Sequence, residues 1–260
     1  MKKTRWIGAL ACLLCLLTVL TSCGTPALRY DEEEGGFVGQ GGLVYVRAGK
    51  SYAAVGIDKE VATAKIKQDG DDILLYPVCS ETADMDRTIW MAAEDFTLYC
   101  KKGTTLPKLW EMQIGEVRVM QSTSATFIVA YLTEAEEIAG LINAYQNKKA
   151  FSFQTIQGAY INEPPTKYLL ACASQNYDGL YYMLTYYRFE YDVKVTETLD
   201  ASVTRENFVP AYDTYYTLRD GEGGVLVAEY NFGKNIIQDR TTGECYAVSG
   251  VFEAHFDQNN

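Results

Sequence analysis

The sequence contains a single histidine, His255, close to its C-terminal end. A serine–histidine or cysteine–histidine mechanism needs an imidazole base, so any such mechanism would have to use this residue. There is no GxSxG motif, and no cysteine stands in a recognisable catalytic frame. The sequence therefore argues against cysteine-peptidase and transpeptidase chemistry and singles out no catalytic residue.

The sequence also lacks the ligand spacing that is typical of metal and phosphate sites. One histidine and scattered cysteines without a CxxC pair do not form a zinc site. The acidic turn at 69–72 is too short for a calcium loop and lacks its terminal glutamate. The glycine clusters contain no GxxxxGK[ST] motif. We therefore predict no metal and no cofactor.

Tyrosine is abundant, with 20 copies, and a cluster of tyrosines falls on one expected hairpin. Successive strand residues point to opposite faces, which allows part of this cluster to form an exposed aromatic platform. Such platforms bind sugars and protein partners, while the alternative is that these rings fill the core. The candidate binding residues are Tyr177, Tyr181, Tyr182, Tyr186, Tyr187 and Arg188.

The N-terminus has the features of an export signal. Residues 1–5 contain Lys2, Lys3 and Arg5, and residues 6–20 form an apolar run. Fifteen helical residues span about 22 Å, which is short of a hydrocarbon core of roughly 30 Å. The run ends in Leu20-Thr21-Ser22-Cys23, and this order of charge, apolar run and box resembles the lipobox signal of bacterial lipoproteins.

The lipoprotein resemblance covers residues 1–23 only. It implies that residues 1–22 are a cleaved signal peptide and that Cys23 receives the lipid, which holds the protein at the extracytoplasmic face of the cell membrane. Outside the cytoplasm, an even number of cysteines permits disulfides. The four cysteines that remain leave open three pairings or buried thiols: Cys79, Cys100, Cys172 and Cys245.

The net charge of −11 excludes some partners. Removal of the basic signal makes the chain more acidic still. An acidic surface repels nucleic acid and anionic headgroups, so we predict no nucleic-acid partner and attachment through lipid rather than a basic patch.

The elements that would position any site are mostly strands. Residues 23–42 are acidic and glycine-rich, which predicts a flexible tether. Residues 43–260 alternate between short apolar runs and turns, and Pro164-Pro165 suggests two halves, 43–150 and 165–260, as an alternative to one domain. The period of Ile138, Leu141, Ile142 and Tyr145 predicts one amphipathic helix over 134–146.

The sequence also predicts a helix cap and several hairpins. Thr133 and Glu136 have the spacing of a capping box at the start of the helix. Asp178-Gly179 is a favoured two-residue turn, which would place Ala173 opposite Leu184 in a central hairpin with two apolar faces. The C-terminal segment predicts two more hairpins, with glycine-containing loops at 220–224 and 239–243.

The fold class expected from this pattern is α+β, with antiparallel β hairpins and one helix packed on a sheet. The functional hypothesis is a membrane-anchored, non-catalytic binding or envelope-interaction module with a protein or glycan ligand. One alternative is a cell-wall or carbohydrate hydrolase that uses acidic residues. Another is a structural or accessory envelope lipoprotein.

Overall fold

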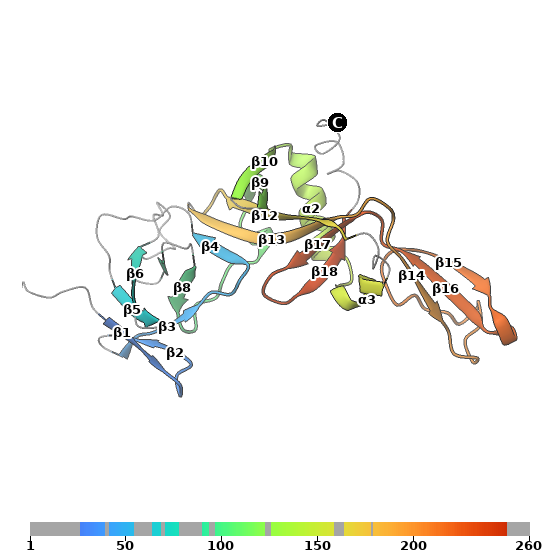
Figure 1. The fold of residues 1–260 in the computed structure, drawn as a ribbon, viewed down its shortest axis with the longest axis horizontal. Helices are drawn as coiled ribbons and strands as arrows, with labels where there is room; N and C mark the ends of the chain where they lie inside the picture. The colour runs from blue at the N-terminus through green and yellow to red at the C-terminus, as the bar shows by residue number, and fades with distance from the viewer. Residues whose placement is uncertain are drawn as a thin grey trace, which may run out of the picture.

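The computed structural model describes residues 27–39, 42–54, 64–68, 71–77, 90–93, 97–122, 126–158, 164–177 and 179–248. The predicted signal peptide 1–22, Cys23, Cys79 and His255 lie outside the described residues. Three sheets follow one another along the longest axis of the molecule (Figure 1). The fold is α+β, as predicted, because antiparallel sheets dominate and one substantial helix packs on the middle sheet.

The first sheet closes on itself and lies at one end of the molecule (Figure 1). Its order is β1-β2-β3-β8-β7-β6-β5, and a parallel pairing of β1 with β5 closes the circle. Leu75 and Tyr99 are among the residues that fill its interior. The strands are β1 (Ala27–Asp31), β2 (Gly36–Val38), β3 (Val44–Arg47), β5 (Ala64–Gln68), β6 (Asp71–Pro77), β7 (Trp90–Ala92) and β8 (Leu98–Lys101).

Part of the segment 23–42, which the sequence predicts as a flexible tether, forms the strands β1 and β2. The Asp31 carboxylate accepts hydrogen bonds from the backbone N–H groups of Glu33 and Glu34 at 2.9 and 3.0 Å, which fixes a tight turn. A Cβ atom on Gly36 would lie 2.7 Å from the Tyr45 carbonyl oxygen, so glycine permits close approach of β2 to β3. The acidic and glycine residues of this segment thus stabilise the turn and the strand pairing of a hairpin.

The middle sheet has the order β10-β9-β12-β13-β17-β18-β11, and β4 pairs with part of β13. Because β4 follows β3 in the chain after a short turn, this pairing connects the closed sheet to the middle sheet. The strands are β4 (Tyr52–Ala54), β9 (Ile114–Ser122), β10 (Thr126–Leu132), β11 (Phe151–Ser152), β12 (Thr166–Ser174), β13 (Leu180–Arg188), β17 (Asn235–Asp239) and β18 (Glu244–Ala247).

The helix α2 (Ala135–Asn147) confirms the helix predicted over 134–146. Its apolar stripe packs on one face of the middle sheet, with Ile138 and Leu141 buried against the strands. The predicted capping box does not form, because Glu134 occupies the N-cap position without a side-chain hydrogen bond. The short 3-10 helix η2 (Leu109–Glu111) contacts α2 from the segment before β9.

The central hairpin is β12–β13, but its register differs from the prediction. Ala173 lies opposite Tyr181, three residues from the predicted partner Leu184. The predicted register was therefore wrong, and because the shift is odd, side chains of the two strands share a face in other combinations than that register implies. The Ser174 hydroxyl accepts a hydrogen bond from the Tyr177 N–H at 3.0 Å and donates to the Met112 carbonyl at 2.6 Å, which ends β12 early.

The third sheet, β14-β16-β15, lies at the opposite end of the molecule from the closed sheet (Figure 1). Its hairpin β15–β16 was predicted, with a loop that contains the short 3-10 helix η4 (Glu222–Gly224). Tyr230 and Phe232 join its core to the lower part of the middle sheet and to α3 (Phe153–Gln157). The strands are β14 (Lys194–Thr198), β15 (Tyr215–Asp220) and β16 (Leu226–Asn231).

Within the described part of the chain, no helix is both long and apolar enough to cross a bilayer. The division into halves 43–150 and 165–260 stays a prediction. The strands β9 and β10 of the first half and β12 and β13 of the second half belong to the same middle sheet.

Candidate functional site

The tyrosine cluster predicted as a binding face is divided between the two faces of β13. Tyr182 and Tyr186 point toward α2 and are buried in the main core. Tyr177 packs against the same core, while Tyr187 packs on the Phe153 ring at the second core. Arg188 is half-buried at the end of β13. Of the six candidates, Tyr181 lines a concave surface, on the face opposite α2.

That surface is an apolar groove of about 590 Å³, which we call the sheet groove. Its floor is the face of β9, β10, β12 and β13 that α2 does not cover. Alternation along the strands separates the two faces, so that Leu170 faces α2 while Leu169 faces the groove. The floor side chains are Met120, Ile128, Leu169, Ala171, Tyr181 and Met183. Its volume is in the range of small-molecule sites, which are typically about 300–1,000 Å³.

The sheet groove is cationic although the chain is acidic. Arg47, Lys50, Arg118 and Arg240 line it, and no described carboxylate does. Arg118 lies 5.2 Å from the centre of the Tyr181 ring and pairs with Glu116 at 2.6 Å. Its hydrogen bond to Glu116 raises the pKa of the guanidinium. In the part of the chain that the structure describes, Lys50 and Arg240 have no ion-pair partner, so their charges are available to a ligand.

A buried polar cluster, the Asp239 hub, holds the loops that carry Lys50 and Arg240. The Asp239 side chain is 0% exposed and accepts hydrogen bonds from the hydroxyls of Tyr145 at 2.6 Å and Tyr182 at 2.5 Å. Further donors come from the Ser51 hydroxyl and two backbone N–H groups at 241 and 242. The hub therefore joins α2, β13, β17 and the turn before β4.

Ser51 makes this junction compact. Its hydroxyl accepts hydrogen bonds from the backbone N–H groups of Arg240 and Thr241, each at 3.1 Å, and its own N–H donates to the Thr241 hydroxyl at 2.9 Å. Gly49 has a φ of +96°, and a Cβ atom there would lie 2.9 Å from the Thr241 hydroxyl oxygen. Glycine is needed at this position for both reasons. The cationic end of the sheet groove is therefore fixed by buried contacts.

The ionisation of Asp239 predicts acid sensitivity. Burial raises the pKa of its carboxyl, but the hydrogen bonds from Tyr145, Tyr182, Thr242 and Thr241 outweigh burial and hold the pKa below its ordinary value. The stabilisation is complete above the unfolded pKa of about 4 and is lost as the pH falls through the folded value. We expect urea denaturation to show less stability at pH 3 than at pH 7. The Asp239→Asn variant should show a smaller difference, and an unchanged difference would contradict this assignment.

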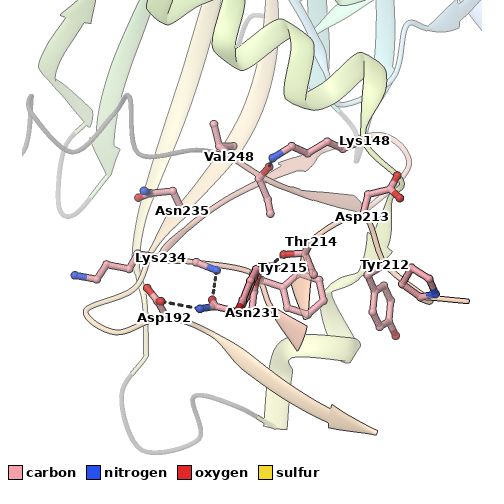
Figure 2. Close-up of a pocket in the computed structure, with 14 residues that line it drawn as sticks. Lys148, Asp192, Tyr212, Asp213, Thr214, Tyr215, Asn231, Lys234, Asn235 and Val248 are labelled. Atoms are coloured by element: carbon pink, nitrogen blue, oxygen red, sulfur yellow. Dashed lines mark hydrogen bonds between the residues drawn. The ribbon is translucent and has the colours of Figure 1, made fainter. Parts of the chain in front are cut away.

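A second concavity, which we call the polar cleft, lies between the third sheet and the strands β17 and β18. Its volume is about 740 Å³. Figure 2 shows Asp192 and Asp213 at opposite ends of the cleft, with Thr214 and Tyr215 between them. The Asn231 amide donates to the Asp192 carboxylate at 2.9 Å. The cleft therefore presents fixed polar groups beside an aromatic ring.

The cysteine thiols of the described residues are inaccessible. Cys100, Cys172 and Cys245 are buried free thiols, and burial raises the pKa of Cys172 and Cys245 to about 12. Such thiols are poor nucleophiles and poor metal ligands. The described residues contain no group of three or more side chains suited to hold a metal ion. The Asp239 hub is acidic and hydrogen-bonded, but it is closed to a substrate by its burial.

Comparison of the chain with protein-family models, with curated proteins and with solved structures returned no match. A function is therefore inferred from the geometry of the sheet groove and the polar cleft. Sequence reasoning missed the basic residues of the sheet groove, because they come from three segments that lie far apart in the chain. It also missed Tyr215, which no local pattern distinguishes from the other tyrosines.

Proposed function

We propose that this protein is a membrane-anchored extracytoplasmic binding protein whose sheet groove takes an amphipathic anion. The signal-like N-terminus and Cys23 support the anchor. The observation that carries the ligand class is an apolar groove with four cationic side chains and no described carboxylate in its lining. A ligand with an apolar chain and a carboxylate or phosphate head matches both features.

The two parts of the ligand would bind to different parts of the groove. The apolar chain lies on Met120, Leu169 and Met183, where burial of each methylene is worth about 0.8 kcal/mol. The anionic head lies between Lys50 and Arg240, whose backbone segments the Asp239 hub holds in place. Because both loops are fixed before binding, little conformational entropy is lost when the head is captured.

Decanoate is a suitable probe, titrated by calorimetry into the chain from Gly24 onward, which contains every described element. We expect saturable binding for decanoate and much weaker binding for 1-decanol, which has the same chain without the charge. The Lys50→Glu and Arg240→Glu variants should each bind decanoate about tenfold more weakly, because each replaces attraction with repulsion.

The matched control is Arg219→Glu, which makes the same charge change at an exposed position on β15, outside the groove. Its affinity for decanoate should equal that of the unaltered protein. Equal affinity for decanoate and 1-decanol would contradict an anionic ligand. Equal losses in Lys50→Glu and Arg219→Glu would show that total charge, rather than the groove, governs binding.

A further inference from the structure

The polar cleft differs from the sheet groove in its charge balance. Its described lining contains two lysines, Lys148 and Lys234, and two aspartates, Asp192 and Asp213. Lys148 is further constrained, since its ammonium donates to the Ala247 carbonyl oxygen at 2.7 Å and burial lowers its pKa. A cleft with balanced charges and many hydrogen-bonding groups suits a neutral polar ligand, whereas the groove suits an anion.

Tyr215 provides a platform at the centre of the cleft (Figure 2). It is the first residue of the edge strand β15, and its side chain is 73% exposed. No other ring in the described residues packs against it. An exposed tyrosine ring presents an apolar face and a polar tip, which is the surface that the apolar faces of sugar rings stack upon.

The polar groups beside this ring are held before any ligand arrives. Asn231 lies directly opposite Tyr215 across the β15–β16 pair. Its amide nitrogen donates to Asp192, and its amide oxygen accepts from the Gly233 N–H at 2.8 Å. Figure 2 shows these bonds, and it shows the Lys234 side chain beyond Asp192 with its ammonium directed away from Tyr215. Donors and acceptors in fixed positions next to an aromatic face are suited to hydroxyl groups around a ring.

We propose that the polar cleft is a binding site for a neutral saccharide, separate from the sheet groove. One sugar ring stacks on Tyr215 and its hydroxyl groups hydrogen-bond to Asp192, while Lys234 at the end of the cleft is left for a neighbouring sugar. The volume of about 740 Å³ exceeds the needs of a single sugar ring, and the cleft is open, so that a chain of sugars extends beyond it. An extracytoplasmic protein anchored at Cys23 would meet such chains in the cell envelope.

The test uses the full chain in lipid nanodiscs, titrated by calorimetry with two neutral probes, cellotetraose and the tetramer of N-acetylglucosamine. We expect saturable binding of at least one probe. Tyr215→Ala should weaken that binding by about tenfold or more. Tyr215→Phe, which keeps the ring, should remain within about threefold of the unaltered protein. Tyr30→Ala removes a tyrosine of similar exposure from the closed sheet and should change nothing.

Three results would overturn the saccharide site. They are no saturable binding of either probe, equal affinity of Tyr215→Ala and the unaltered protein, or a Tyr215→Phe variant as weak as Tyr215→Ala. Lys50→Glu should leave sugar binding unchanged, because Lys50 does not line the cleft. A failure of sugar binding would therefore leave the decanoate result intact, and a failure of decanoate binding would leave the sugar result intact.

Discussion

Replacing Asp239 with alanine is expected to lower the free energy of unfolding by about 3–5 kcal/mol, because five buried hydrogen-bond donors lose their shared acceptor at once. The carboxylate is fully buried and accepts hydrogen bonds from three side-chain hydroxyls and two backbone N–H groups. Removing it leaves these donors without their acceptor inside the protein. An unsatisfied buried polar group costs about 1–3 kcal/mol, and part of this is recovered as the donors rearrange.

The effect should extend beyond stability, because the Asp239 hub joins three other parts of the fold to β17. Tyr145 belongs to α2, Tyr182 to β13, and Ser51 to the turn before β4. The same turn carries Lys50, so a folded fraction of Asp239→Ala should also bind decanoate more weakly. Burial, with the charge of Asp239 as a further cause, raises the pKa of Tyr52 to about 12, which keeps this nearby ring neutral.

Chemical denaturation followed by tryptophan fluorescence and circular dichroism measures this change. The control is Asp220→Ala, an aspartate on β15 that pairs with Arg205 at the surface at 2.9 Å. Exposed ion pairs contribute little to stability, so this variant should unfold close to the unaltered protein. Comparable denaturation midpoints for Asp239→Ala and Asp220→Ala would show that the hub is not a stability determinant.

Local patterns in the sequence were sufficient to predict those elements whose stabilising contacts lie close together in the chain. The apolar period of Ile138, Leu141, Ile142 and Tyr145 located α2 to within about one residue. The loop after Asp220 likewise located the β15–β16 hairpin. The class α+β follows from these elements, since strands with turn residues between them and a single amphipathic helix must bury their apolar faces on each other.

The failures have long-range causes. The segment around Asp31 has the composition of a tether, but Gly36 lies against Tyr45 and Lys102 pairs with Glu34 at 2.9 Å, and neither contact is encoded locally. The register of β12–β13 depends on Ser174, whose hydroxyl reaches the Met112 carbonyl in a distant loop. Composition could not predict a turn that is stabilised by another part of the chain.

The residues of the candidate sites could not be predicted for a similar reason, since contacts between distant parts of the chain bring them together. Arg47, Lys50, Arg118 and Arg240 are spread over almost 200 positions, and only the sheet order brings them to one groove. Alternation along β13 did predict that its tyrosines would be divided between two faces. It did not predict which face α2 would cover, and that choice decides that Tyr181 lines a groove while Tyr182 is buried.

The adjacent leucines of β12 should separate stability from binding. Leu170 is 0% exposed in the core beneath α2, so Leu170→Ala should lower the free energy of unfolding by about 2–5 kcal/mol through lost burial and a residual cavity. Leu169 faces the sheet groove and is half-buried, so Leu169→Ala should cause a clearly smaller loss of stability.

For decanoate binding, Leu169→Ala should have the larger effect and Leu170→Ala the smaller. Leu169→Ala removes part of the surface on which the apolar chain lies, and decanoate affinity should fall by about three- to tenfold. Leu170→Ala, measured at a temperature where it remains folded, should bind decanoate as the unaltered protein does, because a sheet separates Leu170 from the ligand. Denaturant titration and calorimetry on the same two variants give both quantities. Equal effects of the two substitutions on either measurement would refute the assignment of one face of the middle sheet to folding and the other to ligand.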